Sequence, residues 1–276
     1  MNNELSLAFI GGGNMASALA GGLADRILPA RNIHVIEVNE PAHDAWRARG
    51  VSVAAAPDER LAACQVWVYA VKPQVMAEVV AQTRPFLQDA LVISIAAGVR
   101  SDTLSAWLGT PESPWQRLVR CMPNTPSLIG AGASGLAALP GVAQADRALA
   151  EQMLGAVGEV VWVDDDRALD AVTALSGSGP AYVFQFLQAL IDGGCELGLS
   201  AAQSRQLALA TFAGATRLAA ESSESPDVLR ERVTSKGGTT AAALAVLAGQ
   251  GMPQIVSQAM KAAAARAREM GDEFAK

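Results

Sequence analysis

The segment Val233–Thr240, which reads VTSKGGTT, carries the residues best suited to bind a small anion. Gly237 and Gly238 allow the backbone to turn, and the alanine-rich run after them predicts a helix that begins at Thr240. The first N–H groups of a helix have no partner within it and attract negative charge. We therefore expect a site for a small carboxylate or phosphate beside the hydroxyls of Thr239 and Thr240. Helix capping is the alternative role for these two threonines.

A second glycine-rich segment, FIGGGNMA at residues 9–16, fits the pattern Gly-x-Gly-x-x-Ala. It lies between a predicted strand and a predicted helix, as in dinucleotide-binding proteins. Gly11 would permit the tight turn, Gly13 would let a pyrophosphate approach the backbone, and Ala16 would allow the helix to pack closely on the strand. The segment therefore predicts a nicotinamide dinucleotide site.

An acidic residue at the end of the second strand usually binds the adenosine ribose of such a cofactor. Glu37 is the candidate here, and Glu40 is the second choice. A carboxylate at this place would repel a 2′-phosphate, which favours NADH modestly over NADPH. A solvated strand end is the alternative interpretation of Glu37.

Three further segments follow predicted strands: VYAVKPQ at 68–74, IAAG at 95–98 and RCMPNTP at 120–126. Loops at the carboxyl ends of parallel strands line the ligand crevice, although each of these loops could be ordinary turn chemistry. With the first glycine-rich segment they complete the set of candidate cofactor residues: Ile10, Gly11, Gly13, Asn14, Met15, Glu37, Ala70, Val71, Lys72, Pro73, Ala97, Gly98 and Asn124.

Strands and helices alternate in residues 1–163, which predicts an α/β fold with a doubly wound, mostly parallel sheet. Strands are expected at 5–10, 33–38, 66–71, 91–96 and 118–121, with two more at 135–139 and 159–163. Only helical patterns follow in residues 164–276, and the segment SGSGP at 176–180 should kink or break them. We place the domain boundary near residue 163.

The composition excludes several classes of function. The net charge of −6 leaves no basic stripe for nucleic acid, and no apolar run approaches the ~20 residues of a membrane span. Three distant cysteines argue against a disulfide framework, and two histidines predict no metal site. The start of the chain lacks the basic segment of a signal peptide, so a cytoplasmic location is expected. Slim helices rich in alanine and glycine favour a homodimer with interleaved helices, with an ordinary helical domain as the alternative.

In six segments the chain resembles the pyrroline-5-carboxylate reductases. They are FIGGGNMA at 9–16, AVKPQ at 70–74, SIAAG at 94–98, RCMPNTP at 120–126, DAVTALSGSGPAY at 170–182 and VTSKGGTT at 233–240. The resemblance implies an N-terminal Rossmann domain, a C-terminal all-helical dimerisation domain, and reduction of L-1-pyrroline-5-carboxylate to L-proline with NADPH or NADH. It also implies an active site between subunits, and a dimer that in many members joins a larger ring.

The resemblance also implies roles for the C-terminal turn. Thr240 would contact the imine nitrogen as the catalytic residue. The substrate carboxylate would be held by Ser235, Gly237, Gly238, Thr239 and Thr240, with Ser176 at the border of the pocket. The chain departs from the family pattern at Glu37 and Val38, which puts the cofactor preference in doubt. It also has Pro57 and Asp58 where many members have an asparagine that touches the ribose.

Two alternatives remain open at this stage. A β-hydroxyacid dehydrogenase-like reductase would need a catalytic lysine or histidine on the helical domain, which has no histidine and few lysines. A nucleotide-binding protein without catalytic activity would keep residues 9–16 but would not need the GGTT turn.

Overall fold

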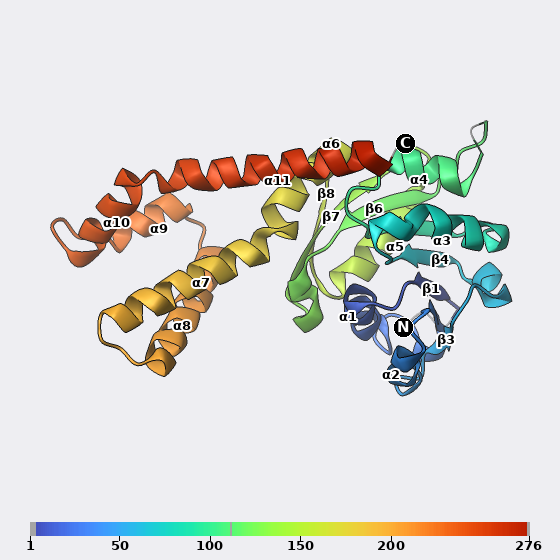
Figure 1. Ribbon diagram of the computed structural model, residues 1–276, viewed down its shortest axis with the longest axis horizontal. Coiled ribbons are helices and arrows are strands. Elements are labelled where there is room, and N and C mark those ends of the chain that lie inside the picture. Colours follow the sequence, from blue (N-terminus) through green and yellow to red (C-terminus); the bar gives the residue numbers. More distant parts are fainter. Residues whose placement is uncertain (1–3, 111, 275–276) are drawn as a thin grey trace. The chain divides into compact units, whose positions relative to one another are not determined.

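The computed structural model describes residues 4–110 and 112–274 and divides into two compact units (Figure 1). Within the described residues, the first unit comprises the chain up to Ser178 together with the segment from Ala262 onward, and the second comprises Gly179–Lys261. The functional boundary expected near residue 163 stays a prediction. Residues 1–3, on which the expectation about a signal peptide depends, lie outside the described residues.

The first unit is built on one eight-stranded sheet with the order β3-β2-β1-β4-β5-β6-β7-β8. Every neighbouring pair is parallel except β6 and β7, which confirms the expected mostly parallel sheet. The strands are β1 (Leu7–Ile10), β2 (Ile33–Ile36), β3 (Ser52–Ala54), β4 (Val66–Tyr69), β5 (Leu91–Ser94), β6 (Leu118–Met122), β7 (Gly132–Ala138) and β8 (Gly158–Trp162).

Helices connect these strands, as the alternating pattern predicts. They are α1 (Asn14–Leu23), α2 (His43–Arg47), α3 (Met76–Thr83), α4 (Ser101–Leu108), α5 (Gln144–Gly155) and α6 (Asp166–Val172). Short 3-10 turns lie at η1 (Ala30–Asn32), η2 (Glu40–Ala42), η3 (Glu59–Ala63), η4 (Pro73–Val75), η5 (Arg84–Phe86) and η6 (Thr125–Ile129). The sequence pattern did not predict β3 and α4. β3 has only three residues, all half-buried, so it lacks a clear apolar signal.

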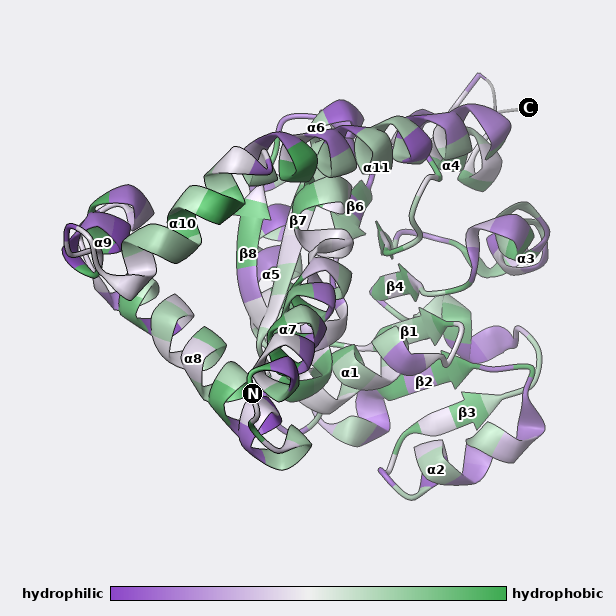
Figure 2. Cartoon of the chain, turned by 60° about the vertical axis from the view of Figure 1, so that its left-hand side comes forward, coloured by the Kyte–Doolittle hydropathy of each residue, from purple (hydrophilic) through white to green (hydrophobic). Residues whose placement is uncertain are grey.

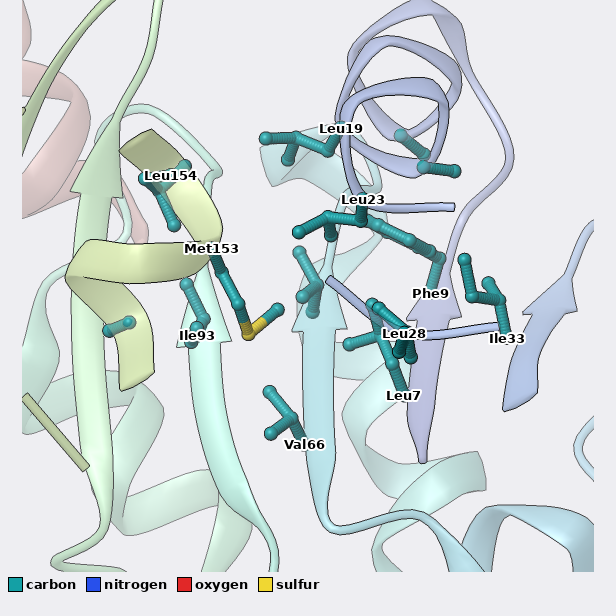
Figure 3. Packing of buried hydrophobic residues seen from close by; sticks show 14 of the residues in the cluster. Leu7, Phe9, Leu19, Leu23, Leu28, Ile33, Val66, Ile93, Met153 and Leu154 are labelled. Atoms are coloured by element: carbon teal, nitrogen blue, oxygen red, sulfur yellow. The ribbon is translucent and has the colours of Figure 1, made fainter. Parts of the chain in front are cut away.

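Side chains alternate between the two faces of the sheet, because successive residues of a strand point to opposite sides. On one face Leu7, Phe9 and Val66 pack with residues of α1 such as Leu19 and Leu23 (Figure 3). Figure 3 also shows Met153 and Leu154 of α5 in this cluster. Burial on both faces fixes the strand register and therefore the positions of the strand ends.

The opposite face contains the two largest fully buried side chains, Trp67 and Tyr69. Each has a partner for its polar atom: Trp67 Nε1 donates to the Leu61 carbonyl at 3.0 Å, and the Tyr69 hydroxyl lies 2.7 Å from Thr83 Oγ1. A buried polar atom without a partner would be costly. These bonds therefore stabilise β4 directly before the loop that carries the AVKPQ segment.

The second unit is entirely helical. It contains α7 (Gly179–Glu196), α8 (Ala201–Glu221), α9 (Pro226–Arg232), α10 (Thr239–Gly249) and the first part of α11 (Met252–Phe274). α7 packs on α8, with the rings of Phe186 and Phe212 6.4 Å apart, and a capping box between Ser200 and Gln203 starts α8. None of the described helices is long and apolar enough to cross a membrane.

Candidate functional site

The candidate cofactor residues gather at one edge of the sheet. They lie at the carboxyl ends of β2, β1, β4, β5 and β6, which are consecutive, parallel neighbours. In open α/β sheets this edge is where ligands bind. The end of β1 carries Ile10, and the loop and helix after it carry Gly11, Gly13, Asn14 and Met15. After β2 comes Glu37; after β4 come Ala70, Val71, Lys72 and Pro73; after β5 come Ala97 and Gly98; and after β6 comes Asn124.

Gly11 joins two of these loops by close contact. Its φ is +100°, a conformation that favours glycine. Its N–H donates to the Ile36 carbonyl at 2.9 Å, and a Cβ at this position would lie 2.8 Å from both the Ala70 carbonyl oxygen and Val71 Cγ1. Gly11 therefore serves both the turn after β1 and the packing of that turn on the loop after β4.

The N-terminus of α1 has the features of a pyrophosphate site. Gly13 is the N-cap, no side chain caps the helix, and the first turn contains no acidic residue. A Cβ on Gly13 would have no atom within 4 Å, so space is open in front of the helix end. Free N–H groups of the first turn attract an anion such as a pyrophosphate. The residues present therefore fit a dinucleotide.

We predict that Gly11→Ala both destabilises the fold and impairs cofactor binding. The positive φ would cost about 1–3 kcal/mol in a residue with a Cβ, and the contact with Ala70 adds to it. Gly13→Ala is the matched control, because its φ of −71° suits alanine. Thermal unfolding should separate the two: Gly11→Ala melts early, whereas Gly13→Ala melts like the wild type but binds NADH more weakly. A wild-type melting temperature for Gly11→Ala would contradict this.

Glu37 is held in place and is not a solvated strand end. Its Oε2 accepts the Gly12 N–H at 2.8 Å, and its Oε1 accepts the Asn39 N–H at 2.7 Å. Its carbonyl lies 2.6 Å from Nε2 of the buried His43. The carboxylate is therefore fixed beside the glycine-rich loop, where the adenosine ribose of a dinucleotide is bound in this kind of fold.

Two other residues, the candidate Gly98 and the neighbouring-loop residue Asp58, have surroundings that the sequence did not predict. Gly98 has a φ of +78°, and a Cβ there would lie 2.9 Å from Met270 Cβ of α11, so this glycine permits a close helix contact. Asp58, in the segment that departs from the family pattern, caps η3 by accepting the Arg60 N–H at 3.0 Å and lies 3.1 Å from His34 Nε2. Its carboxylate is therefore already occupied within the protein.

The predicted anion-binding turn lies in the second unit, at the start of α10. The Gly238 N–H donates to the Ser235 carbonyl at 3.0 Å, and Gly237 has a φ of +73°, as the third residue of a type II turn requires. A Cβ on Gly238 would lie 2.6 Å from Ser235 Oγ. The backbone therefore requires glycine at 237, whereas Gly238, with a φ of −81°, leaves the Ser235 hydroxyl room beside the turn.

The two threonines of this turn do not cap the helix. The N-cap of α10 is Gly238, which has no side-chain cap, and the first turn carries no acidic residue. Neither the Thr239 nor the Thr240 hydroxyl has a hydrogen-bond partner among the residues that the structure describes. The first N–H groups of α10 therefore lie beside two hydroxyls that are free to bind a ligand.

Ser176 belongs to the first unit, in a five-residue π-helix, η7 (Thr173–Gly177), between α6 and α7. The expected kink at SGSGP therefore takes the form of a π-turn. Asn124 is tied to it, because its Nδ2 donates to the Ser176 carbonyl at 3.0 Å. The structure thus connects Ser176 to the cofactor edge through Asn124, while the remaining candidate substrate residues lie in the second unit.

Comparison with known proteins agrees with this arrangement. Residues 166–270 match the family model for pyrroline-5-carboxylate reductase dimerisation, and residues 6–98 match that for coenzyme F420-dependent NADP oxidoreductases. Over 272 residues the chain is 43% identical to the pyrroline-5-carboxylate reductase of Pseudomonas aeruginosa, covering 97% of each protein. The chain belongs to the pyrroline-5-carboxylate reductase family.

Solved structures of the pyrroline-5-carboxylate reductase family share the whole fold. The Coxiella burnetii enzyme is 37% identical, with a TM-score of 0.88 over 97% of this chain and 99% of that one. The Plasmodium falciparum enzyme, solved with NADP bound, is 31% identical, with a TM-score of 0.86 over 98% and 100%. The expected Rossmann sheet, helical dimerisation domain and nicotinamide dinucleotide cofactor are thereby confirmed, whereas the individual site residues stay predictions.

A cluster of polar residues near this edge was not predicted from the sequence. The buried Arg120 donates from Nη1 to Asp166 Oδ1 at 2.7 Å, and Asp166 Oδ2 accepts both the N–H and the hydroxyl of Ser101, at 2.8 and 2.7 Å. Burial opposes the charge on Asp166, but Arg120 and Ser101 outweigh it and lower the pKa of this carboxyl. The available signal was an arginine, Arg120, within the apolar strand predicted at 118–121.

Proposed function

We propose that the protein reduces L-1-pyrroline-5-carboxylate to L-proline with NADPH or NADH, as the last step of proline biosynthesis. The observation that carries this proposal is the turn before α10, where unpaired backbone N–H groups lie beside two hydroxyls without partners among the described residues. Such a site suits a carboxylate joined to a group that needs a hydrogen-bond donor. Family membership identifies a cyclic imine that bears a carboxylate as the matching substrate.

The cofactor would be held by the edge of the sheet described above. Gly13, Asn14 and Met15 would bind the pyrophosphate at the N-terminus of α1, and Glu37 would face the ribose. The nicotinamide, when bound, supplies the hydride. The small residue Ala97, after β5, would leave room for it, whereas Gly98 packs against α11.

The turn before α10 would orient the substrate. The N–H groups from Thr239 onward, with the side chains of Ser235 and Thr239, would hold the carboxylate and keep the ring in a near-attack position. Thr240 Oγ1 would donate a hydrogen bond to the imine nitrogen or relay a proton from water to it. Since a protonated imine is already a good electrophile, a hydroxyl is sufficient and no strong acid is required.

We infer that the active unit is a homodimer, and that dimers join a larger ring as in many family members. Only Ser204 and Ala208 are buried among the described residues of the second unit. α10 is apolar all round, as its colour in Figure 2 shows, yet none of its residues is buried. A helix of this kind is normally covered, and another copy of the chain can cover it. A cytoplasmic location stays a prediction.

The test is an assay of NAD(P)H oxidation with purified protein. Pyrroline-5-carboxylate should support turnover, whereas hydroxy acids and keto acids should not. Light scattering should give the mass of a dimer or a multiple of it. Turnover with a hydroxy acid or keto acid but not with the imine would contradict the proposal.

A further inference from the structure

The π-helix η7 is linked to the cofactor edge through Asn124. It spans Thr173–Gly177 and is closed by a bond from the Ser178 N–H to the Thr173 carbonyl at 2.8 Å. Isolated π-turns are rare and are often found at functional sites. The chain enters the second compact unit directly after this turn, at Gly179. The position of η7 therefore sets both where Ser176 lies and where the chain leaves the first unit.

Asn124 fixes the C-terminal part of this segment. Its Nδ2 donates to the Ser176 carbonyl at 3.0 Å, and its Oδ1 accepts the Ala133 N–H at 2.8 Å. The residue is only 9% exposed. Both ends of the amide are thus used inside the protein, in a bridge between the loop after β6, the start of β7 and the π-turn. This side chain is arranged to hold the turn, and a contact with the cofactor is not needed to explain it.

Asp166 fixes the N-terminal end of the same segment. It is the first residue of α6 and binds Arg120 of β6 and Ser101 of α4 through three hydrogen bonds. The segment from Asp166 to Ser176 is therefore tied at both ends to β6 and the loop that follows it.

The segment between these two anchors packs closely on its neighbours. A Cβ on Gly177 would lie 2.6 Å from Met122 Cε, and a Cβ on Gly135 would lie 2.6 Å from Val172 Cγ1. The segment is thus pressed against β6 on one side and β7 on the other. We therefore expect a change at either anchor to shift the turn, since close-packed interiors transmit strain.

We propose that Asn124 is a positioning residue of the reductase. It holds the carbonyl of Ser176 and acts on hydride transfer through the π-turn, and it does not bind the cofactor. The inference rests on the proposed function, because the turn borders the proposed substrate pocket. It replaces the sequence-based prediction that Asn124 is a cofactor ligand.

The test is Asn124→Asp, which keeps the shape and the acceptor for Ala133 but sets an oxygen against the Ser176 carbonyl. We expect kcat to fall at least about tenfold, while the Kd values for NADPH and NADH, from fluorescence titration, change less than about twofold. Hydrogen exchange of residues 173–178 should become faster. Unchanged kcat or unchanged exchange would overturn the proposal, as would a large rise in the cofactor Kd with kcat preserved at saturation.

A pH profile adds a readout that a merely destabilised protein would not give. Once protonated, the carboxyl group of the Asn124→Asp variant can donate to the Ser176 carbonyl as the amide does, so the ratio of variant to wild-type kcat should recover as the pH falls from about 8 to about 6. The charged groups on the packed elements, Arg120, Asp166 and Asp170, are common to both proteins, so the ratio isolates the substituted position. A ratio that is independent of pH would count against the proposed bond.

The matched control is Asn32→Asp in the same unit. Asn32 Nδ2 also donates to a backbone carbonyl, that of Leu5, at 3.0 Å, but it lies at the opposite end of β2 from the cofactor edge. This control should lose stability without loss of kcat. If Asn124→Asp does not fold, Asn124→Ala should show the same separation of kcat from Kd without recovery at low pH. If the wild-type protein does not turn over pyrroline-5-carboxylate, the proposed function is refuted. The hydrogen-exchange measurement tests the Asn124 bridge independently of that activity.

Discussion

Thr240→Ala should lower kcat for pyrroline-5-carboxylate by about 100-fold while leaving the Kd for NADPH or NADH unchanged. The hydroxyl of Thr240 has no hydrogen-bond partner among the described residues, and Gly238, without a side-chain cap, starts α10. Its removal therefore costs the fold little, and the melting temperature should stay within about 2 °C of the wild type. Loss of this hydroxyl should lower kcat, because it removes the hydrogen bond to the imine nitrogen.

Two variants control this measurement. Thr240→Ser retains the hydroxyl and should keep kcat within about tenfold of the wild type. Thr234→Ala removes a neighbouring threonine whose hydroxyl donates to the Arg230 carbonyl at 2.6 Å, so it should affect stability and leave kcat unchanged. Wild-type turnover by Thr240→Ala would contradict the proposed catalytic role of Thr240.

The sheet could be predicted because its strands are short apolar runs bounded by glycine, proline and polar residues. β1, β2, β4 and β5 are buried along their whole length, and this is why their runs stand out. β3 and α4 were missed because β3 is only half-buried and α4 is a helix of eight residues that begins with three polar ones. Periodicity predicts an element only where burial is one-sided or complete over enough residues.

The candidate site shows the same limit more sharply. Glycine spacing predicted the turn of Gly11 and the turn of Gly237 and Gly238, because a positive φ or a close contact leaves a mark in the sequence. The bridge of Asn124 and the cluster of Arg120 and Asp166 join residues far apart along the chain. No local pattern encodes such a pairing, so only the folded structure reveals it.

A single chain does not bury most of the apolar side chains of the second unit. This unit is helical, as the sequence predicts, but its helices leave apolar side chains such as Phe184, Leu207 and Val246 exposed at 64%, 56% and 64%. A stable domain of this kind needs a partner surface. This supports the proposed dimer, in which a second copy would cover the unit that contains the Thr240 turn.

The second large effect should appear at Glu37. We predict that kcat/KM for NADH equals or exceeds that for NADPH, because Gly12 and Asn39 fix the carboxylate where a 2′-phosphate would approach. Glu37→Gln removes the charge at nearly constant shape and should raise kcat/KM for NADPH by about tenfold relative to NADH. A tenfold change corresponds to about 1.4 kcal/mol, which is within the range expected for unit charges about 4 Å apart near a surface.

Ionic strength and a neighbouring variant test whether this effect is electrostatic. Added salt screens charges, so the preference of the wild type for NADH should shrink as salt rises, and the preference of Glu37→Gln should respond less. Glu40→Gln removes an exposed charge from the same loop and should leave the cofactor ratio as it is. If Glu40→Gln shifts the ratio and Glu37→Gln does not, the ribose-facing carboxylate is Glu40. If the wild-type kcat/KM for NADPH exceeds that for NADH by about tenfold, neither carboxylate selects against the phosphate. The reason is that a fixed negative charge beside a bound phosphate has to weaken its binding unless a cation compensates.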